Sequence, residues 1–174
     1  MDYRYLYKKL NKRTPLKTDC GLICSNACCV DTDGEELGMY LFPGEEEMFE
    51  GKENFVVEDS EVEYGNKKGK ILYCKPYCNR KERPLACRIF PLFPYITRDG
   101  ELKIIVDPRG RGICPLYKKE VNEFNPSFVR GVRHIADILV SENECYEFLY
   151  EVSRIIDEEI EIILENYRKM VKNV

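Results

Sequence analysis

Hydrophobic residues in the last third of the chain recur at the spacing of an amphipathic helix. Asn125 is a preferred N-cap residue and Pro126 suits the first helical position, so a helix is predicted to begin there. The apolar residues that follow share one face until about Val140, where this helix is predicted to end.

A second helix is predicted directly after the first. Ser141 and Glu144 form a capping-box pattern, and an apolar stripe then continues at helical spacing to Val171. The stripe predicts either one helix of about thirty residues or a helix that breaks near Asp157. Residues 126–172 are therefore predicted to form a helical hairpin that packs against a sheet and the cysteine-containing loops.

The middle of the chain has the composition of β-strands. Valine, isoleucine and aromatic residues are concentrated in residues 54–58, 60–64, 70–73 and 102–106. The glycine-rich segment 65–69 predicts a hairpin loop between two of these strands. A small antiparallel sheet is the expected result.

The N-terminal residues predict a short amphipathic helix, because Tyr3, Leu6, Tyr7 and Leu10 lie at positions i, i+3, i+4 and i+7. This segment lacks the apolar region of a secretory signal. No apolar run approaches the roughly 20 residues that span a bilayer. We therefore expect a cytoplasmic protein with no membrane partner, in a compartment that keeps thiols reduced.

These elements predict an α+β fold in one domain, residues 1–174. Within it, residues 14–115 are expected to hold the sheet and metal-gripping cysteine-rich loops, and residues 116–174 the helical hairpin. The apolar and charged fractions, 44% and 33%, are those of a globular protein slightly rich in charge.

The cysteines are the most informative residues of the sequence. Four of the nine fall within the ten residues 20–29, and hydrophobic residues chosen for packing do not cluster in this way. Thiolates three or four residues apart can converge on one soft metal ion. With four cysteines further along the chain, the candidate ligands are Cys20, Cys24, Cys28, Cys29, Cys74, Cys78, Cys87 and Cys114.

Eight thiols are twice what one tetrahedral ion requires. Three arrangements stay open: one four-cysteine site with the other thiols structural, two four-cysteine zinc sites, or an iron–sulfur cluster with spare thiols nearby. The adjacent Cys28 and Cys29 can share one metal only if the backbone turns sharply, because neighbouring side chains of an extended segment project to opposite sides.

The remaining histidine and cysteine have simpler interpretations. His134, the only histidine, is interpreted as an ordinary helical residue, which disfavours a mixed Cys/His zinc site. Cys145 lies on the apolar stripe of the last helix and is expected in the core. A disulfide framework is the alternative for the cysteines as a whole, and their odd number and the expected compartment argue against it.

Charge is unevenly distributed, although the net charge is only −4. Residues 31–63 carry thirteen acidic residues against Lys52 alone and are interpreted as a solvated face. Residues 75–111 carry nine basic and four acidic residues. Cations near thiolates lower thiol pKa values and offset the charge of a thiolate site, and the same cations would suit an anionic partner. Nucleic acid is disfavoured, because the chain is acidic overall and lacks a stacking motif. The cations concerned are Arg80, Arg83, Arg88, Arg109 and Arg111.

The motif Cys20-x₃-Cys24-x₃-Cys28-Cys29, followed by Cys78 and Arg83-Pro-x₂-Cys87-Arg-x-Phe-Pro91, resembles the bacterial YkgJ-type cysteine-cluster proteins. The resemblance covers roughly residues 18–115 and implies a zinc- or iron-chelating domain. Family members often space the first cysteines two apart, where this chain has three. The segment is also similar to that of flagellin lysine-N-methylases, which are associated with an iron–sulfur cluster and methyl transfer. No glycine-rich segment that would cradle S-adenosylmethionine follows a predicted strand.

Two functions are therefore expected in competition. The first is a non-catalytic or metal-handling protein that chelates zinc, or alternatively iron, through cysteine thiolates. The second is an enzyme with an iron–sulfur ([4Fe–4S]) or other metal site, in redox or methyl-transfer chemistry. A lone histidine and the lack of a Ser/His/Asp arrangement favour the first. A metal ion is the expected partner, and a protein partner stays open.

Overall fold

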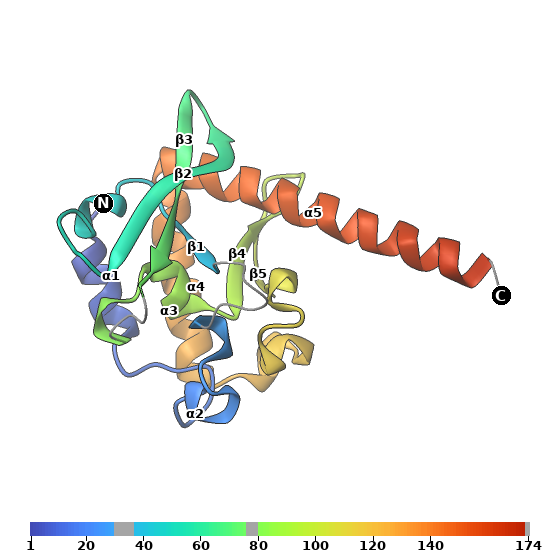
Figure 1. Cartoon of the computed structure of the whole chain (residues 1–174), viewed down its shortest axis with the longest axis horizontal. Helices are drawn as coiled ribbons and strands as arrows, with labels where there is room; N and C mark the ends of the chain where they lie inside the picture. The colour runs from blue at the N-terminus through green and yellow to red at the C-terminus, as the bar shows by residue number, and fades with distance from the viewer. Residues whose placement is uncertain (30–36, 76–79, 173–174) are drawn as a thin grey trace.

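The computed structural model describes residues 1–29, 37–75 and 80–172 (Figure 1). Its larger sheet has three antiparallel strands in the order β1-β3-β2. Strand β3 is central, with Tyr73 opposite Gly38 of β1 and Cys74 opposite Phe55 of β2. The strands are β1 (Gly38–Leu41), β2 (Phe55–Tyr64) and β3 (Lys67–Cys74).

A second sheet is the antiparallel hairpin of β4 (Leu92–Ile96) and β5 (Leu102–Val106). The short helix α3 (Leu85–Ile89) directly precedes β4, and the two are joined through a cis peptide bond between Phe90 and Pro91. Helix α3 also contacts β1 and the N-terminal helix α1 (Tyr3–Leu10), so it lies at the centre of the fold.

The two C-terminal helices, α4 (Pro126–Ser141) and α5 (Asn143–Lys172), pack against each other and against the strands. Phe148 of α5 is fully covered and meets the rings of Phe42 and Tyr64 edge-on. Ser153 of α5 accepts a hydrogen bond of 2.9 Å from the backbone N–H of Ile96 at the end of β4. These contacts fix the first half of α5 on the body of the protein.

The second half of α5 leaves the body and extends away from it, as the red part of the helix in Figure 1 shows. Shorter helical turns connect the other elements. They are α2 (Gly21–Cys24), η1 (Ala27–Cys29), η2 (Glu46–Met48), η3 (Arg80–Glu82), η4 (Pro108–Gly110), η5 (Pro115–Lys118) and η6 (Val121–Glu123).

The α+β class and the antiparallel sheet are confirmed. Asn125 caps α4 as predicted, since its side chain accepts a hydrogen bond from the N–H of Ser127. Ser141 does not cap the next helix: it is the last residue of α4, and its hydroxyl donates to the carbonyl of Ile138. Helix α5 continues through Asp157 without a break.

Other strand predictions were wrong in detail. Residues 54–58 and 60–64 form one strand, β2, whose register shifts between Asp59 and Glu63. Strands β1 and β4 were not predicted as strands. No helix among the described residues is both long and apolar enough to cross a bilayer.

Candidate metal centre

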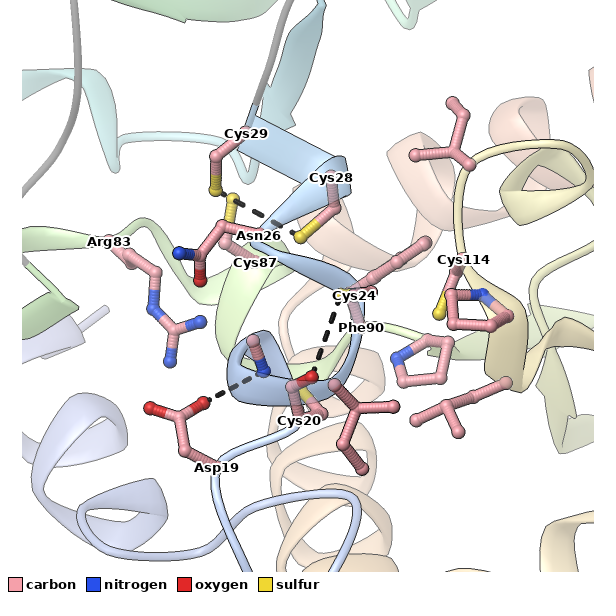
Figure 2. A pocket seen from close by; sticks show the side chains of 16 residues that line it. Asp19, Cys20, Cys24, Asn26, Cys28, Cys29, Arg83, Cys87, Phe90 and Cys114 are labelled. Carbon is pink, nitrogen blue, oxygen red and sulfur yellow. Dashed lines mark hydrogen bonds between the residues drawn. The ribbon is translucent and has the colours of Figure 1, made fainter.

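Six of the eight candidate ligands line one cavity of about 290 Å³ (Figure 2). They come from three segments that are distant in the sequence: the turn-rich segment 20–29, helix α3 and the residue before η5. The six are Cys20, Cys24, Cys28, Cys29, Cys87 and Cys114. We call this the cysteine cavity.

The segment that carries four of these thiols consists of two short helical turns joined by a tight bend. The carboxylate of Asp19 accepts a hydrogen bond of 3.0 Å from the N–H of Gly21 at the start of α2. After α2, Ser25 and Asn26 both take left-handed backbone conformations, with φ of 51° and 58°. The chain then turns into η1, where the N–H of Cys29 donates to the carbonyl of Asn26 at 2.7 Å.

This turn brings the adjacent thiols of Cys28 and Cys29 to the same side, with their Sγ atoms 3.9 Å apart. Such a turn was predicted as the condition for Cys28 and Cys29 to share one metal ion. Two thiolates of a tetrahedral zinc site are separated by about 3.8 Å, given bonds of about 2.3 Å. The Cys28–Cys29 pair therefore has the spacing of two ligands of one ion.

Helix α3 brings Cys87 to the cavity, and a buried carboxylate holds the start of that helix. Glu45 is fully covered and accepts hydrogen bonds from the N–H groups of Leu85 (2.6 Å) and Phe42 (3.1 Å) and from the hydroxyl of Tyr7. Burial raises the pKa of Glu45 to about 7. Glu45 thus ties α1, the end of β1 and α3 together behind the cavity.

The opposite wall carries Cys114. The N–H of Cys114 donates to the carbonyl of Gly110 at 2.8 Å, which closes the turn between η4 and η5. A Cβ atom at position 110 would lie 3.1 Å from the ring of Phe90, so glycine lets the turn approach this ring closely. Phe90, Pro91 and Leu116 give the cavity an apolar side next to the thiols.

Two of these thiols, those of Cys28 and Cys87, lie in surroundings that favour their protonated form. A hydrogen bond with Cys29, and then burial, raise the pKa of Cys28. Burial, with the nearby thiols of Cys29 and Cys74, raises the pKa of Cys87, and the guanidinium of Arg83 acts in the opposite direction. Thiols in this state release protons when they bind a metal ion.

The thiols around the cavity also influence one another electrostatically. Cys87 is influenced by Cys29 and Cys74, and Cys28 by Cys29, Cys87 and Cys24. Burial raises the pKa of Cys114, and Cys20 and Cys24 act in the same direction. Cys24 thus influences both Cys28 and Cys114, which links the thiols of the three segments.

The candidate arginines have different surroundings. Arg83 lines the cysteine cavity. Arg88 does not donate to a thiol in the described structure: its side chain stacks on the ring of Tyr7 and donates to the carbonyls of Arg83 and Lys81.

Two other candidate arginines lie outside the cavity lining. Arg109 forms an ion pair of 2.8 Å with Asp107 and covers the ring of Phe93. Arg111 is exposed, and the side chain of Arg80 lies outside the described residues.

Cys74, Cys145 and His134 do not line the cavity. Cys74 ends β3, as predicted, and influences Cys87 electrostatically. Cys78 lies outside the described residues. Cys145 is buried in the core, which confirms its interpretation, and burial raises its pKa to about 11. His134 is an exposed residue of α4.

Within residues 1–29, 37–75 and 80–172, no three cysteine, histidine or acidic side chains are positioned so that they could hold a metal ion together. The donor set nevertheless suits zinc or iron in its chemistry, since it consists of thiols around one cavity. Rotation about χ1 moves a cysteine Sγ between staggered positions while the backbone stays in place. A bound ion would require such rotations beyond the Cys28–Cys29 pair.

Sequence reasoning missed one residue of this region, Glu45. It was interpreted as part of the solvated acidic face of residues 31–63, whereas its side chain is completely buried just before η2 begins at Glu46. No signal in the sequence separated Glu45 from the acidic residues that follow it, because its burial depends on donors from Tyr7, Phe42 and Leu85.

Comparisons with known proteins identify no relative. No protein family matches this chain, and no curated protein or solved structure matches it significantly.

Proposed function

We propose that this protein binds a soft metal ion, zinc or iron, through thiolates of the cysteine cavity. The observation that supports this most directly is the convergence of six thiols from three distant segments on one cavity. A buried cysteine is compatible with an ordinary core, but six around one open space leave sulfur atoms without close packing. Metal ligation is the chemistry that such a donor set serves.

The proposed first ligands are Cys28, Cys29 and Cys87. The first two have the separation of two thiolates on one ion, and all three influence one another electrostatically. Cys74 and Cys78 are candidates for a fourth position. The bound ion would supply a closed thiolate site that stabilises the fold, and Arg83 would offset part of its negative charge.

The resemblance of the cysteine segments to YkgJ-type cysteine-cluster proteins supports the same proposal. Its motif joins residues 20–29 to the stretch 83–91, and both segments line the cysteine cavity. The resemblance in sequence and the location of both segments at the cysteine cavity therefore support the same metal site.

A second candidate is an enzyme with an iron–sulfur cluster, which requires space beside the cluster for a substrate. The cysteine cavity favours this candidate in one respect. Its volume of about 290 Å³ exceeds the space of one ion, and Phe90, Ile113 and Leu116 give it an apolar side. The first proposal needs no such space.

Metal and acid-labile sulfide, measured together on anaerobically purified protein, test both proposals. Zinc at one or two ions per chain without sulfide supports chelation, and several iron ions with matching sulfide support the cluster. The double variant Cys28→Ser/Cys29→Ser should lose the metal, whereas Cys145→Ser, a buried thiol of the core, should keep it. Failure to bind zinc or iron, even after reconstitution with excess metal and sulfide, would refute metal binding.

A further inference from the structure

Helix α5 carries one apolar stripe along its whole length, but the body of the protein covers only half of it. Leu149, Val152 and Ile156 lie on this stripe and are completely buried. The stripe continues beyond Asp157 on the part of the helix that extends from the body (Figure 1). Its exposed members are Ile160, Ile163, Leu164, Tyr167, Met170 and Val171, whose exposed fractions range from 38% to 70%.

These residues have the spacing of a helix–helix seam. Ile160, Ile163, Tyr167 and Met170 alternate at intervals of three and four, which is the a/d pattern of a coiled coil. Residues 157–172 extend over about 24 Å, the length of two heptads. A helix of this length gains most of its stability from packing of its apolar face, so this segment requires a partner surface.

Charge along the same segment is separated by sign. Residues 157–165 contain five acidic and no basic residues, and residues 166–172 contain three basic and no acidic residues. A parallel pair of these helices would place acidic halves together and basic halves together. An antiparallel pair would place each acidic half beside a basic half, which is the favourable arrangement.

We propose that the projecting half of α5 binds the same segment of a second copy of this chain, as an antiparallel helix pair. Such a pair has two-fold symmetry, so one apolar stripe covers its own equivalent. With the axis near residues 164 and 165, Ile160 lies opposite the partner's Met170 and Ile163 lies opposite the partner's Tyr167.

The charges outside the stripe agree with this orientation through their sum and not through one ion pair. Glu161 and Arg168 follow the seam positions Ile160 and Tyr167 but face away from the seam. Glu161 contacts the exposed Arg98 of the same chain at 3.2 Å. In an antiparallel pair the acidic half of each copy lies alongside the basic half of the other, which attracts the two helices at low salt.

Asp157 marks the inner end of the proposed interface. It is largely buried, accepts a hydrogen bond of 2.6 Å from Tyr95 and pairs with Arg154 at 3.2 Å, so it belongs to the body. The interface therefore begins at the next turn, with Ile160.

Sedimentation equilibrium of the full chain, from about 1 µM to about 200 µM, measures the association directly. We expect a monomer–dimer equilibrium that Ile163→Glu weakens at least about thirtyfold, because a charge would enter the seam. Ile162→Glu is the matched control: Ile162 is also an exposed isoleucine, but it lies on the opposite side of the helix from the stripe. Circular dichroism and thermal melting verify that both variants stay folded.

The salt dependence of association tests the orientation. Between about 20 mM and about 200 mM salt, association should weaken by about threefold to tenfold, because salt screens the attraction between acidic and basic halves, whereas a parallel pair would gain from the same screening. A protein that stays monomeric at all concentrations, or a dimer that Ile163→Glu leaves intact, would overturn the proposal. Association that strengthens over this range of salt would overturn the antiparallel arrangement. All these readouts are independent of metal content.

Discussion

The carboxylate of Glu45 accepts a hydrogen bond of 2.6 Å from the backbone N–H of Leu85, forty residues away in the sequence and two residues before Cys87. A completely buried acid thus fixes the start of the helix that brings Cys87 to the cysteine cavity. The same carboxylate receives the hydroxyl of Tyr7, so the N-terminal helix depends on it as well.

This relationship predicts an unusual dependence of stability on pH. The pKa of Glu45 is about 7 in the folded protein, above its ordinary value of 4.5, because burial disfavours the carboxylate. Between these pH values the folded state holds a proton that the unfolded state has lost. The contribution of Glu45 to the free energy of unfolding should therefore fall by about 3 kcal/mol as pH rises from about 4.5 to about 7.

Urea unfolding of Glu45→Gln and wild-type protein at several pH values, at equal metal content, measures this contribution. The variant should be the less stable protein near pH 5, because its amide cannot satisfy all three donors, and the difference should shrink towards pH 8. Glu47→Gln, at an exposed position, controls for the loss of a carboxylate. Stability curves of wild type and Glu45→Gln that run parallel over the whole range would contradict the prediction.

The proposed ligand set predicts that Cys87→Ser and Cys145→Ser have different consequences. Cys87→Ser should abolish most metal binding, since a hydroxyl is a poor ligand for a soft metal. Cys145→Ser should keep the metal and lose about 1 kcal/mol of stability, because a hydroxyl replaces a buried thiol near the hydroxyl of Tyr3. Metal analysis and urea unfolding of both variants distinguish the two roles, and equal metal content in both would remove Cys87 from the ligand set.

Removal of the metal should destabilise the protein, because the binding free energy of a thiolate site is available only to the folded state. For a chain of this size we expect exhaustive chelation to lower the melting temperature by about 10 °C. Readdition of the metal should restore it. An unchanged melting curve after confirmed metal loss would show that the thiols contribute no folding energy through a metal.

Arg83 and Arg88 should differ in their effects when replaced by alanine. Arg83 lines the cavity and lowers the pKa of Cys87, so Arg83→Ala should weaken metal binding, most strongly at low pH where thiols must lose protons. Arg88 stacks on Tyr7 and holds two backbone carbonyls, so Arg88→Ala should lower stability by about 1–2 kcal/mol.

Competition with a chromophoric chelator at pH 6 and pH 8, together with thermal melting, measures both arginine effects. An Arg88→Ala protein with unchanged stability would show that its stacking contributes nothing. An Arg83→Ala protein with wild-type metal affinity at both pH values would exclude a role for that charge at the site.

The amphipathic helices and the hairpin of β2 and β3 could be predicted because their sequence signals are local. Asn125 caps α4, and the apolar stripe of α5 is visible in the sequence. Strand β1 could not be predicted, since it is four residues long and is defined by its pairing with β3. The role of Ser141 could not be predicted either. Its capping-box pattern with Glu144 does not reveal that α4 continues to Ser141 itself.

The candidate ligands could be predicted as residues but not as neighbours. The density of cysteines identified the segment 20–29. The position of Cys28 and Cys29 on one side depends on the left-handed backbone of Ser25 and Asn26, which the sequence does not predict. Cys114 was predicted as a candidate ligand, but its location could not be predicted. The electrostatic influence of Cys20 and Cys24 on Cys114 depends on the turn at Gly110. Glu45 was hidden among similar residues.

The distribution of the cavity thiols over the chain has a consequence for how the protein unfolds. A metal held by Cys28, Cys29 and Cys87 would close a loop of about 60 residues, and such a cross-link restricts the disordered chain much as a disulfide does. This loop contains β1, β2 and β3, whereas β4, β5, α4 and α5 lie outside it. An unfolding chain that keeps its metal would therefore stay cross-linked in its first half while its second half moves freely.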